Sequence, residues 1–271
     1  MSEPEPGGRM QPLTAMPESS RRAIRVVLTD VDDTLSTDGR ITPQAFDALA
    51  RLRAAGKCVV PITGRPAGWC DHIARMWPVD AVVGENGALY MWHDDAARKL
   101  RRRFIVDEAT RRANRARLAV IGERILAGVP GCALASDQLY READLAIDFC
   151  EDVSPLPRDA VDRIVALMEA EGMTARVSSI HVNGWFGAYD KLTMTRQLFG
   201  EVFATDLDAE RARFVFVGDS PNDAPMFAFF PHAVGVANVR AAADRIATLP
   251  AYVTRAEAGA GFAELVDFLL E

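Results

Sequence analysis

Cysteine is scarce in this sequence, and its four copies are scattered. They are Cys58, Cys70, Cys132 and Cys150, with no CxxC pair among them and no histidine at the spacing of a zinc ligand. This arrangement argues against both a disulfide framework and a structural zinc site. We therefore expect a reducing environment and predict a cytoplasmic location.

Long apolar runs and an excess of positive charge are also lacking. No segment approaches the roughly 18 consecutive apolar residues that a membrane-spanning helix needs. The 38 acidic residues outnumber the 31 basic ones, for a formal net charge of -7, which argues against a sequence-independent grip on nucleic acid. We predict neither a membrane nor a nucleic-acid partner, and the oligomeric state stays open.

Residues 1–20 contain many Pro, Glu, Gly and Ser residues and no apolar core segment. Such a composition is typical of a disordered leader rather than of a signal peptide. The chain as a whole is 49% hydrophobic and 25% charged, which is ordinary for a globular protein. Its 271 residues exceed the usual size of a single-core domain, so we expect two domains.

Apolar segments alternate with helical patterns at both ends of the chain. Strand patterns occupy residues 24–30, 58–63, 81–83, 214–219 and 233–236. Helical patterns follow Thr42-Pro43, span residues 66–76, and close the chain with apolar residues at 262, 265, 266 and 269. This alternation predicts an α/β, doubly wound parallel sheet of the Rossmann type, with functional residues at the carboxyl ends of its strands.

The alternation of strand and helix patterns changes between residues 88 and 187. A helix is expected over 107–128 and another over 157–170, with strands at 144–149, 175–178 and 180–182. This pattern predicts an α+β domain built on an antiparallel sheet. We interpret residues 88–187 as a cap inserted between the core segments 21–87 and 188–271.

The first motif, DVDDT at residues 30–34, follows the first strand directly. If the chain is still extended there, Asp30 and Asp32 lie on the same side, with α-carbons roughly 6.5 Å apart. One carboxylate could attack phosphorus while the other protonates the leaving alcohol and later deprotonates water. Taken alone, however, a DxD at a strand end is more often a turn than a catalytic pair.

The second motif, GDSPND at residues 218–223, also follows an apolar strand. Its hard oxygen ligands suit Mg²⁺, with Asp219 as the direct ligand. Thr63 ends another strand and could hydrogen-bond a phosphate oxygen, and Lys191 could neutralise a phosphoryl group. Singly, Thr63 reads as a helix cap and Lys191 as a surface lysine, but the ordered set is hard to explain as turns.

With these motifs the chain resembles the haloacid dehalogenase-like (HAD) phosphatases of subfamily IIB. This Cof-type group includes sucrose-phosphate phosphatase and mannosyl-3-phosphoglycerate phosphatase. Four motifs match in order, namely DVDDT at 30–34, TGR at 63–65, Lys191 and GDSPND at 218–223. The match spans nearly the whole chain after residues 1–20.

The resemblance implies a HAD core and a role for each motif residue. Asp30 is expected to be the nucleophile and Asp32 the general acid and base, through an aspartyl-phosphate intermediate. The implied phosphate-binding residues are Thr63, Gly64 and Lys191, with Asn222 near the phosphate.

The resemblance also implies a Mg²⁺ cofactor. Asp30, the backbone carbonyl of Asp32, and Asp219 are expected to hold the ion, with Asp223 in or just behind the metal shell. The chain departs from the family pattern at Asp33, where many relatives have Gly, and we do not interpret this as lost activity.

Four further residues are tentative substrate ligands. Arg65 could bind phosphate or substrate, or could equally pair with a surface acid. Asn86 lies in the GENGA segment at 84–88, which resembles the family's lead-in to its cap. His181 and Asn183 lie near the return from the cap, although a histidine in a strand is more often a packing residue.

The leading hypothesis is therefore a Mg²⁺-dependent phosphoric monoester hydrolase acting on a small phosphorylated metabolite, with a sugar phosphate as the expected substrate. A phosphomutase of the phosphomannomutase type would use the same intermediate, and the sequence does not separate the two. A catalytically silent sugar-phosphate-binding module is the third reading. Release of inorganic phosphate, rather than an isomerised sugar phosphate, would distinguish the hydrolase.

Overall fold

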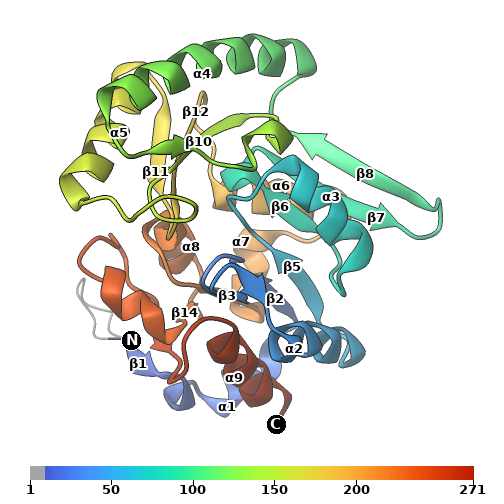
Figure 1. The fold of residues 1–271 in the computed structure, drawn as a ribbon. Coiled ribbons are helices and arrows are strands. Elements are labelled where there is room, and N and C mark those ends of the chain that lie inside the picture. The colour runs from blue at the N-terminus through green and yellow to red at the C-terminus, as the bar shows by residue number, and fades with distance from the viewer. Residues whose placement is uncertain (1–9) are drawn as a thin grey trace.

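A six-stranded sheet lies at the centre of the larger body of the molecule (Figure 1). The computed structural model describes residues 10–271. The strand order is β1-β15-β14-β13-β2-β5, and every neighbouring pair is parallel. The strands are β1 (Gln11–Pro12), β2 (Val26–Thr29), β5 (Cys58–Pro61), β13 (Phe214–Gly218), β14 (Val234–Gly235) and β15 (Tyr252–Val253). The predicted doubly wound parallel sheet is confirmed.

The central strands β2 and β13 are apolar along their whole length because both faces of the sheet are covered. Every residue of these two strands is buried. Val217 pairs with Thr29 across them. This register brings Asp30 and Asp219, the residues that follow the paired segments, to the same edge of the sheet.

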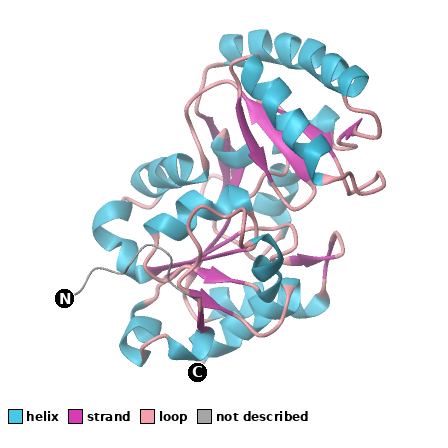
Figure 2. Ribbon diagram, turned by 90° about the vertical axis from the view of Figure 1, so that its left-hand side faces the viewer, coloured by secondary structure: helices cyan, strands magenta, loops and turns pink. Residues whose placement is uncertain are grey.

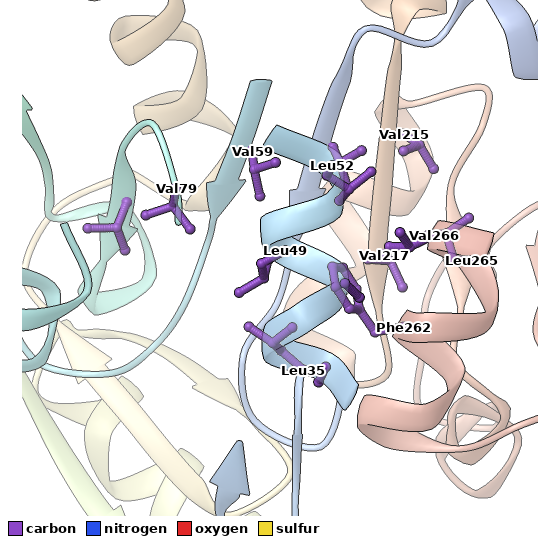
Figure 3. Packing of buried hydrophobic residues seen from close by; sticks show 14 of the residues in the cluster. Leu35, Leu49, Leu52, Val59, Val79, Val215, Val217, Phe262, Leu265 and Val266 are labelled. Carbon is purple, nitrogen blue, oxygen red and sulfur yellow. The ribbon is translucent and has the colours of Figure 1, made fainter. Parts of the chain in front are cut away.

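Helices cover both faces of the sheet. The first face carries α2 (Pro43–Ala54), α3 (Ala67–Met76) and α9 (Ala258–Leu270), and the second carries α6 (Lys191–Val202), α7 (Leu207–Glu210) and α8 (Ala224–Phe229). Figure 3 shows Leu49 and Leu52 of α2 beside Phe262 of α9 and Val217 of the sheet. These contacts form the core that holds the carboxyl edge in place.

A three-stranded antiparallel sheet extends from the core. It consists of β6 (Val82–Gly84), β7 (Leu89–Asp94) and β8 (Lys99–Phe104). Ile62 and Val83 form a parallel bridge to the end of β5, and Leu89 and Met91 pack into the core cluster. We therefore propose that the inserted unit begins near residue 105 rather than at the expected residue 88.

The inserted unit is built on a second sheet, with order β11-β12-β10-β9 and antiparallel pairing. Its elements are α4 (Glu108–Gly128), β9 (Ala133–Leu134), β10 (Asp144–Asp148), α5 (Arg158–Ala170), β11 (Thr174–Val177) and β12 (His181–Trp185). Leu145 and Ile147 pack beneath α4 and α5. The two helices lie on the outer side of this sheet, away from the core (Figures 1 and 2).

Alternation along β10 and β12 sends polar side chains to the face opposite α4 and α5. Asp144 and Asp148 alternate with the core residues of β10, and His181 and Asn183 flank Val182 of β12. All four of these polar residues are buried.

The remaining elements are short. The hairpin β3 (Ser36–Thr37) and β4 (Arg40–Ile41) follows the first motif. The 3-10 helices are η1 (Leu13–Ala15), η2 (Glu85–Gly87), η3 (Gln138–Tyr140), η4 (Arg211–Arg213), η5 (Pro221–Asp223) and η6 (Ala237–Ala242). Across residues 10–271, no helix combines the length and apolar character that a bilayer crossing requires.

The segment before residue 21 differs from the sequence-based prediction. Strand β1 pairs with the edge strand β15, and α1 (Glu18–Ala23) follows it. Leu13 and Met16 are buried in the core cluster. The prediction of a disordered leader is therefore wrong for residues 10–20, because two apolar residues anchor a segment whose average composition is polar. Residues 1–9 of that prediction lie outside the described residues.

Replacing Phe262 with Ala should lower the free energy of unfolding by about 3–5 kcal/mol, because the ring is fully buried and its removal leaves a cavity. Urea unfolding followed by circular dichroism measures this change. The matched control is Phe46→Ala, since Phe46 is 37% exposed and should cost clearly less. Equal losses for the two variants would contradict the assigned core.

Candidate active site

Three buried carboxylates meet at the carboxyl edge of the central sheet. Asp30 follows β2, Asp219 follows β13, and Asp223 ends η5. One oxygen from each lies within 4.8 Å of the others. Three acids in so small a space need positive charge nearby, since each repels the other two.

The loop after β13 is shaped by Asp223. Its Oδ2 accepts hydrogen bonds from the backbone N–H of Asp219 at 3.1 Å and of Ser220 at 3.2 Å. A Cβ atom on Gly218 would collide with the same carboxylate. Only glycine therefore allows the strand to pass this close to Asp223, and this explains the first position of the GDSPND motif.

Lys191 joins two of the three acids. Its Nζ lies 2.6 Å from Asp30 Oδ1 and 2.7 Å from Asp223 Oδ1, and the side chain is buried. Lys191 begins α6, whose N-cap Asp190 accepts a hydrogen bond from the backbone of Thr193. A Cβ on Gly87 would overlap the Asp190 carbonyl, so the start of α6 packs tightly against the end of η2.

Burial dominates the electrostatics of the site. It raises the pKa of Asp30 to about 8, against the attraction of Lys191 and with the repulsion of Asp223 and Asp32. Burial also raises the pKa of Asp219 well above its usual value, with Asp30 and Asp223 adding to the effect. For Lys191, burial lowers the pKa, but Asp223 and Asp30 outweigh it and the pKa is raised. One ammonium group is therefore not enough to keep all three acids ionised at neutral pH, and a further cation would favour their ionised forms.

This donor set fits the expected cofactor. Hard carboxylate oxygens at this separation suit Mg²⁺, and a divalent cation would lower the raised pKa values of Asp30 and Asp219 by favouring their ionised forms. Asp219 is oriented by Thr34 Oγ1, which donates to Oδ1 at 3.0 Å, and by Asn238 Nδ2, which donates to Oδ2 at 3.2 Å. Both oxygens of Asp223 already accept hydrogen bonds, which fits a place behind the metal shell.

Three of the expected phosphate ligands, Thr63, Gly64 and Asn222, lie next to Asn86. Thr63 is fully buried after β5, and its Oγ1 accepts the backbone N–H of Arg65 at 3.0 Å. Asn222 Nδ2 donates to Asn86 Oδ1 at 3.2 Å, and a Cβ on Gly64 would lie only 3.0 Å from the Asn86 amide nitrogen. Among the described residues, Asn86 Nδ2 is a buried donor without a hydrogen-bond partner. A buried amide donor of this kind fits a phosphate oxygen.

Asp32 and Arg65 form a separate pair. Arg65 Nε lies 2.8 Å from Asp32 Oδ1, and the Asp32 carboxylate does not belong to the group of three acids. The guanidinium also contacts Glu151 at 2.5 Å and Asp137 at 3.3 Å, both from the inserted unit. Arg65 thus pairs with acids, one of the two roles that the sequence left open, and these acids are buried or half-buried rather than on the surface.

The two tentative cap ligands differ in their surroundings. His181 Nε2 lies 2.9 Å from Glu151 Oε2, so it belongs to the Arg65 cluster. Asn183 Nδ2 instead donates to Asp144 Oδ2 at 2.9 Å, and Asp144 pairs with Arg141. The structure therefore does not bring Asn183 to the three carboxylates.

Several residues at this junction escaped the sequence analysis. Arg141 donates to the Gly64 carbonyl at 2.8 Å, which links the inserted unit to the TGR segment. Glu85 accepts backbone hydrogen bonds from Ala67 at 2.9 Å and from Ala143 at 2.6 Å. The spacing of Arg141 and Asp144 is a possible ion-pair signal, but nothing in the sequence pairs Glu85 with residue 143.

A cavity of about 600 Å³ lies between the inserted unit and the core. Phe149 and Arg176 line it from the inserted unit, and Pro221 and Arg245 line it from the core. At its rim Arg158 Nη1 lies 3.3 Å from Asp244 Oδ2, with both side chains exposed. Because Pro221 belongs to η5, this cavity reaches the loop that carries Asp219 and Asp223.

Comparisons with known proteins find similar sequences and folds. Residues 27–112 match the model of the haloacid dehalogenase-like hydrolase family. A phosphoglycolate phosphatase of Natronomonas pharaonis is 28% identical over 245 residues, which cover 88% of this chain and 94% of that protein.

Two solved structures share the fold. A protein of Thermoplasma acidophilum matches with a TM-score of 0.67 at 19% identity, over 91% of this chain and 98% of that one. The sucrose-phosphatase of Synechocystis matches with a TM-score of 0.62 at 16% identity, over 92% and 98% of the two chains.

Residues 27–112 thus match the haloacid dehalogenase-like hydrolases in sequence, and the whole chain shares the fold of the two solved structures. It is an enzyme of the phosphoric monoester hydrolase class, a phosphatase. The predicted family and enzyme class are thereby confirmed. The predicted grouping with sucrose-phosphate phosphatase is confirmed at the level of the fold.

Replacing Lys191 with Met should lower the free energy of unfolding by about 3–5 kcal/mol in a buffer containing EDTA, because the substitution leaves buried carboxylates without their cation. Urea unfolding at neutral pH measures the change. Lys99→Met, at an exposed position of β8, is the matched control. Equal stability of the Lys191 variant and the wild type would show that the ion pairs do not hold the acids together.

Proposed function

We propose that this phosphatase is Mg²⁺-dependent and hydrolyses a small phosphate monoester through an aspartyl-phosphate intermediate. A sugar phosphate is the expected substrate class. The observation that carries the proposal is the contact of one buried lysine with Asp30 and Asp223, beside Asp219. A phosphate monoester brings at least one further negative charge, so the same arrangement that holds the acids can hold a phosphoryl group.

In the first half of the reaction, an Asp30 oxygen attacks phosphorus and the bond from phosphorus to the leaving oxygen breaks. Asp32 gives its proton to that oxygen, so the product alcohol leaves neutral. Lys191 contacts Asp30 at 2.6 Å, so its ammonium can also neutralise the phosphoryl oxygens. The buried amide donor of Asn86 and the hydroxyl of Thr63 would bind the remaining oxygens.

In the second half, water attacks phosphorus and Asp32 takes up its proton. The bond between phosphorus and Asp30 breaks, and inorganic phosphate leaves. Arg65 holds Asp32 at 2.8 Å, which directs the acid and base toward the leaving oxygen rather than toward the three-carboxylate group. Asp223 orients Lys191 and the backbone after β13.

Asp30, Asp219 and the backbone carbonyl of Asp32 would hold Mg²⁺, which when bound supplies positive charge against the acids and the phosphate. Asp223 would stand behind these ligands. All four cysteines are free, which supports the proposal of a reducing, cytoplasmic environment.

Asp30→Asn should lower the rate of phosphate release by about 10³-fold or more, because the amide cannot act as the nucleophile. Release of inorganic phosphate from a panel of phosphorylated metabolites, with and without Mg²⁺, measures the loss. Asp38→Asn removes the same charge from an exposed position and should retain full activity. Wild-type turnover in the Asp30 variant would exclude the proposed nucleophile.

Mg²⁺ should raise the melting temperature of the wild-type protein, since a ligand of the folded state at 100 times its Kd stabilises it by about 2.7 kcal/mol. Thermal unfolding with increasing Mg²⁺ measures the shift. Asp219→Asn should lose most of it, because the variant lacks one carboxylate of the group, whereas Asp38→Asn should show the full shift. An unchanged shift in the Asp219 variant would remove Asp219 from the metal site.

A further inference from the structure

The turn after β10 presents one acid to the active site. Asp148, the last residue of β10, accepts backbone hydrogen bonds from Cys150 at 2.9 Å, Glu151 at 2.8 Å and Asp152 at 2.8 Å. These three bonds fix the turn. Asp148 and His181 pair across the sheet, so the turn and the start of β12 lie side by side above Asp32.

Glu151 contacts both sides of the junction. Its Oε1 accepts from Arg65 Nη2 at 2.5 Å, and its Oε2 lies 3.2 Å from Arg65 Nη1 and 2.9 Å from His181 Nε2. Burial raises its pKa, but His181 and Arg65 outweigh burial and hold the pKa at about 2. Glu151 is therefore an anion, and with 22% of its side chain exposed it can still reach a ligand.

The cation in this cluster is already shared among acids. Arg65 faces Asp32, Asp137 and Glu151 at once. The next arginine, Arg141, is itself engaged by Asp137 and Asp144. Within residues 10–271, the cluster around Asp32 therefore holds more carboxylates than guanidinium groups, and neither guanidinium is free of acidic partners.

The position of Asp32 locates the leaving group. Since Asp32 is the proposed proton donor, the leaving oxygen lies next to it, and the rest of the alcohol lies toward Arg65 and Glu151. Hydroxyl groups donate hydrogen bonds that an ionised carboxylate accepts. A carboxylate on the substrate would instead meet Glu151 and Asp137 at this cluster, where both guanidinium groups are already engaged by acids.

We infer that Glu151 is a specificity-determining residue that selects the phosphate ester of a neutral, hydroxyl-bearing alcohol and disfavours a carboxylate-bearing one. This inference rests on the proposed function and narrows its substrate class. It separates this chain from the activity named for its Natronomonas pharaonis relative, since phosphoglycolate carries a carboxylate on the leaving group.

The test compares kcat/KM for glucose 6-phosphate and for 2-phosphoglycolate, with p-nitrophenyl phosphate as a reference that has neither hydroxyl nor carboxylate groups. The wild-type enzyme should favour glucose 6-phosphate by about 10-fold or more, the ratio expected from one well-placed polar contact. Glu151→Gln should reduce this ratio by about 10-fold, mainly by raising KM for the sugar phosphate. Asp152→Asn, an exposed neighbour in the same turn, should leave the ratio unchanged.

Glu151→Asp provides a second variant with the charge kept and the reach shortened. It should raise KM for glucose 6-phosphate while 2-phosphoglycolate remains a poor substrate, and thermal unfolding of each variant shows that it is folded. A wild-type preference for 2-phosphoglycolate, or an unchanged ratio in folded Glu151→Gln, overturns the inference alone. Absence of phosphate release from all three compounds overturns the proposed function and the inference together.

Discussion

The ion pairs of Lys191 with Asp30 and Asp223 are the interaction on which the site depends. Three carboxylates within 4.8 Å would repel one another strongly in a buried place, and the lysine makes their proximity possible. These residues come from distant segments of the chain. Asp30 follows β2, Asp219 follows β13, and Lys191 begins α6. The inserted unit then covers this charge with a polar sheet face and a second, separate ion-pair cluster around Arg65.

The convergence of Asp30 and Asp219 could be predicted from the sequence for a simple reason. Both follow continuous apolar strands, and the carboxyl ends of neighbouring parallel strands share one edge. The alternation of strand and helix patterns predicted the parallel sheet of the core. The different pattern in the middle of the chain indicated the inserted unit. The place of Lys191 came from family resemblance, because its residue type and position alone do not distinguish it from a surface lysine.

The features that were missed depend on contacts between distant segments. Strand β1 has two residues and carries no periodic signal, so only its pairing with β15 reveals it. The roles of three residues in the inserted unit depend on contacts with the core. Arg65 pairs with Glu151 and Asp137, and the Gly64 carbonyl accepts a hydrogen bond from Arg141. Spacing along a chain does not report how one folded unit closes over another, and for the same reason Asn183 could not be assigned to the Asp144 network in advance.

The contacts between the inserted unit and the core differ greatly in strength from one side of the junction to the other. On one side the buried carboxylate of Glu85 binds main-chain groups of both units, at Ala67 and at Ala143. On the other, beside the cavity, the direct ion pair is the exposed one between Arg158 and Asp244, and such surface pairs contribute only about 0–1 kcal/mol. The units should therefore separate more readily at residue 158 than at the buried contacts of Glu85 and Arg65. A substrate would then enter from the side beneath α5, where the exposed ion pair between Arg158 and Asp244 is weak enough to break at ordinary temperature.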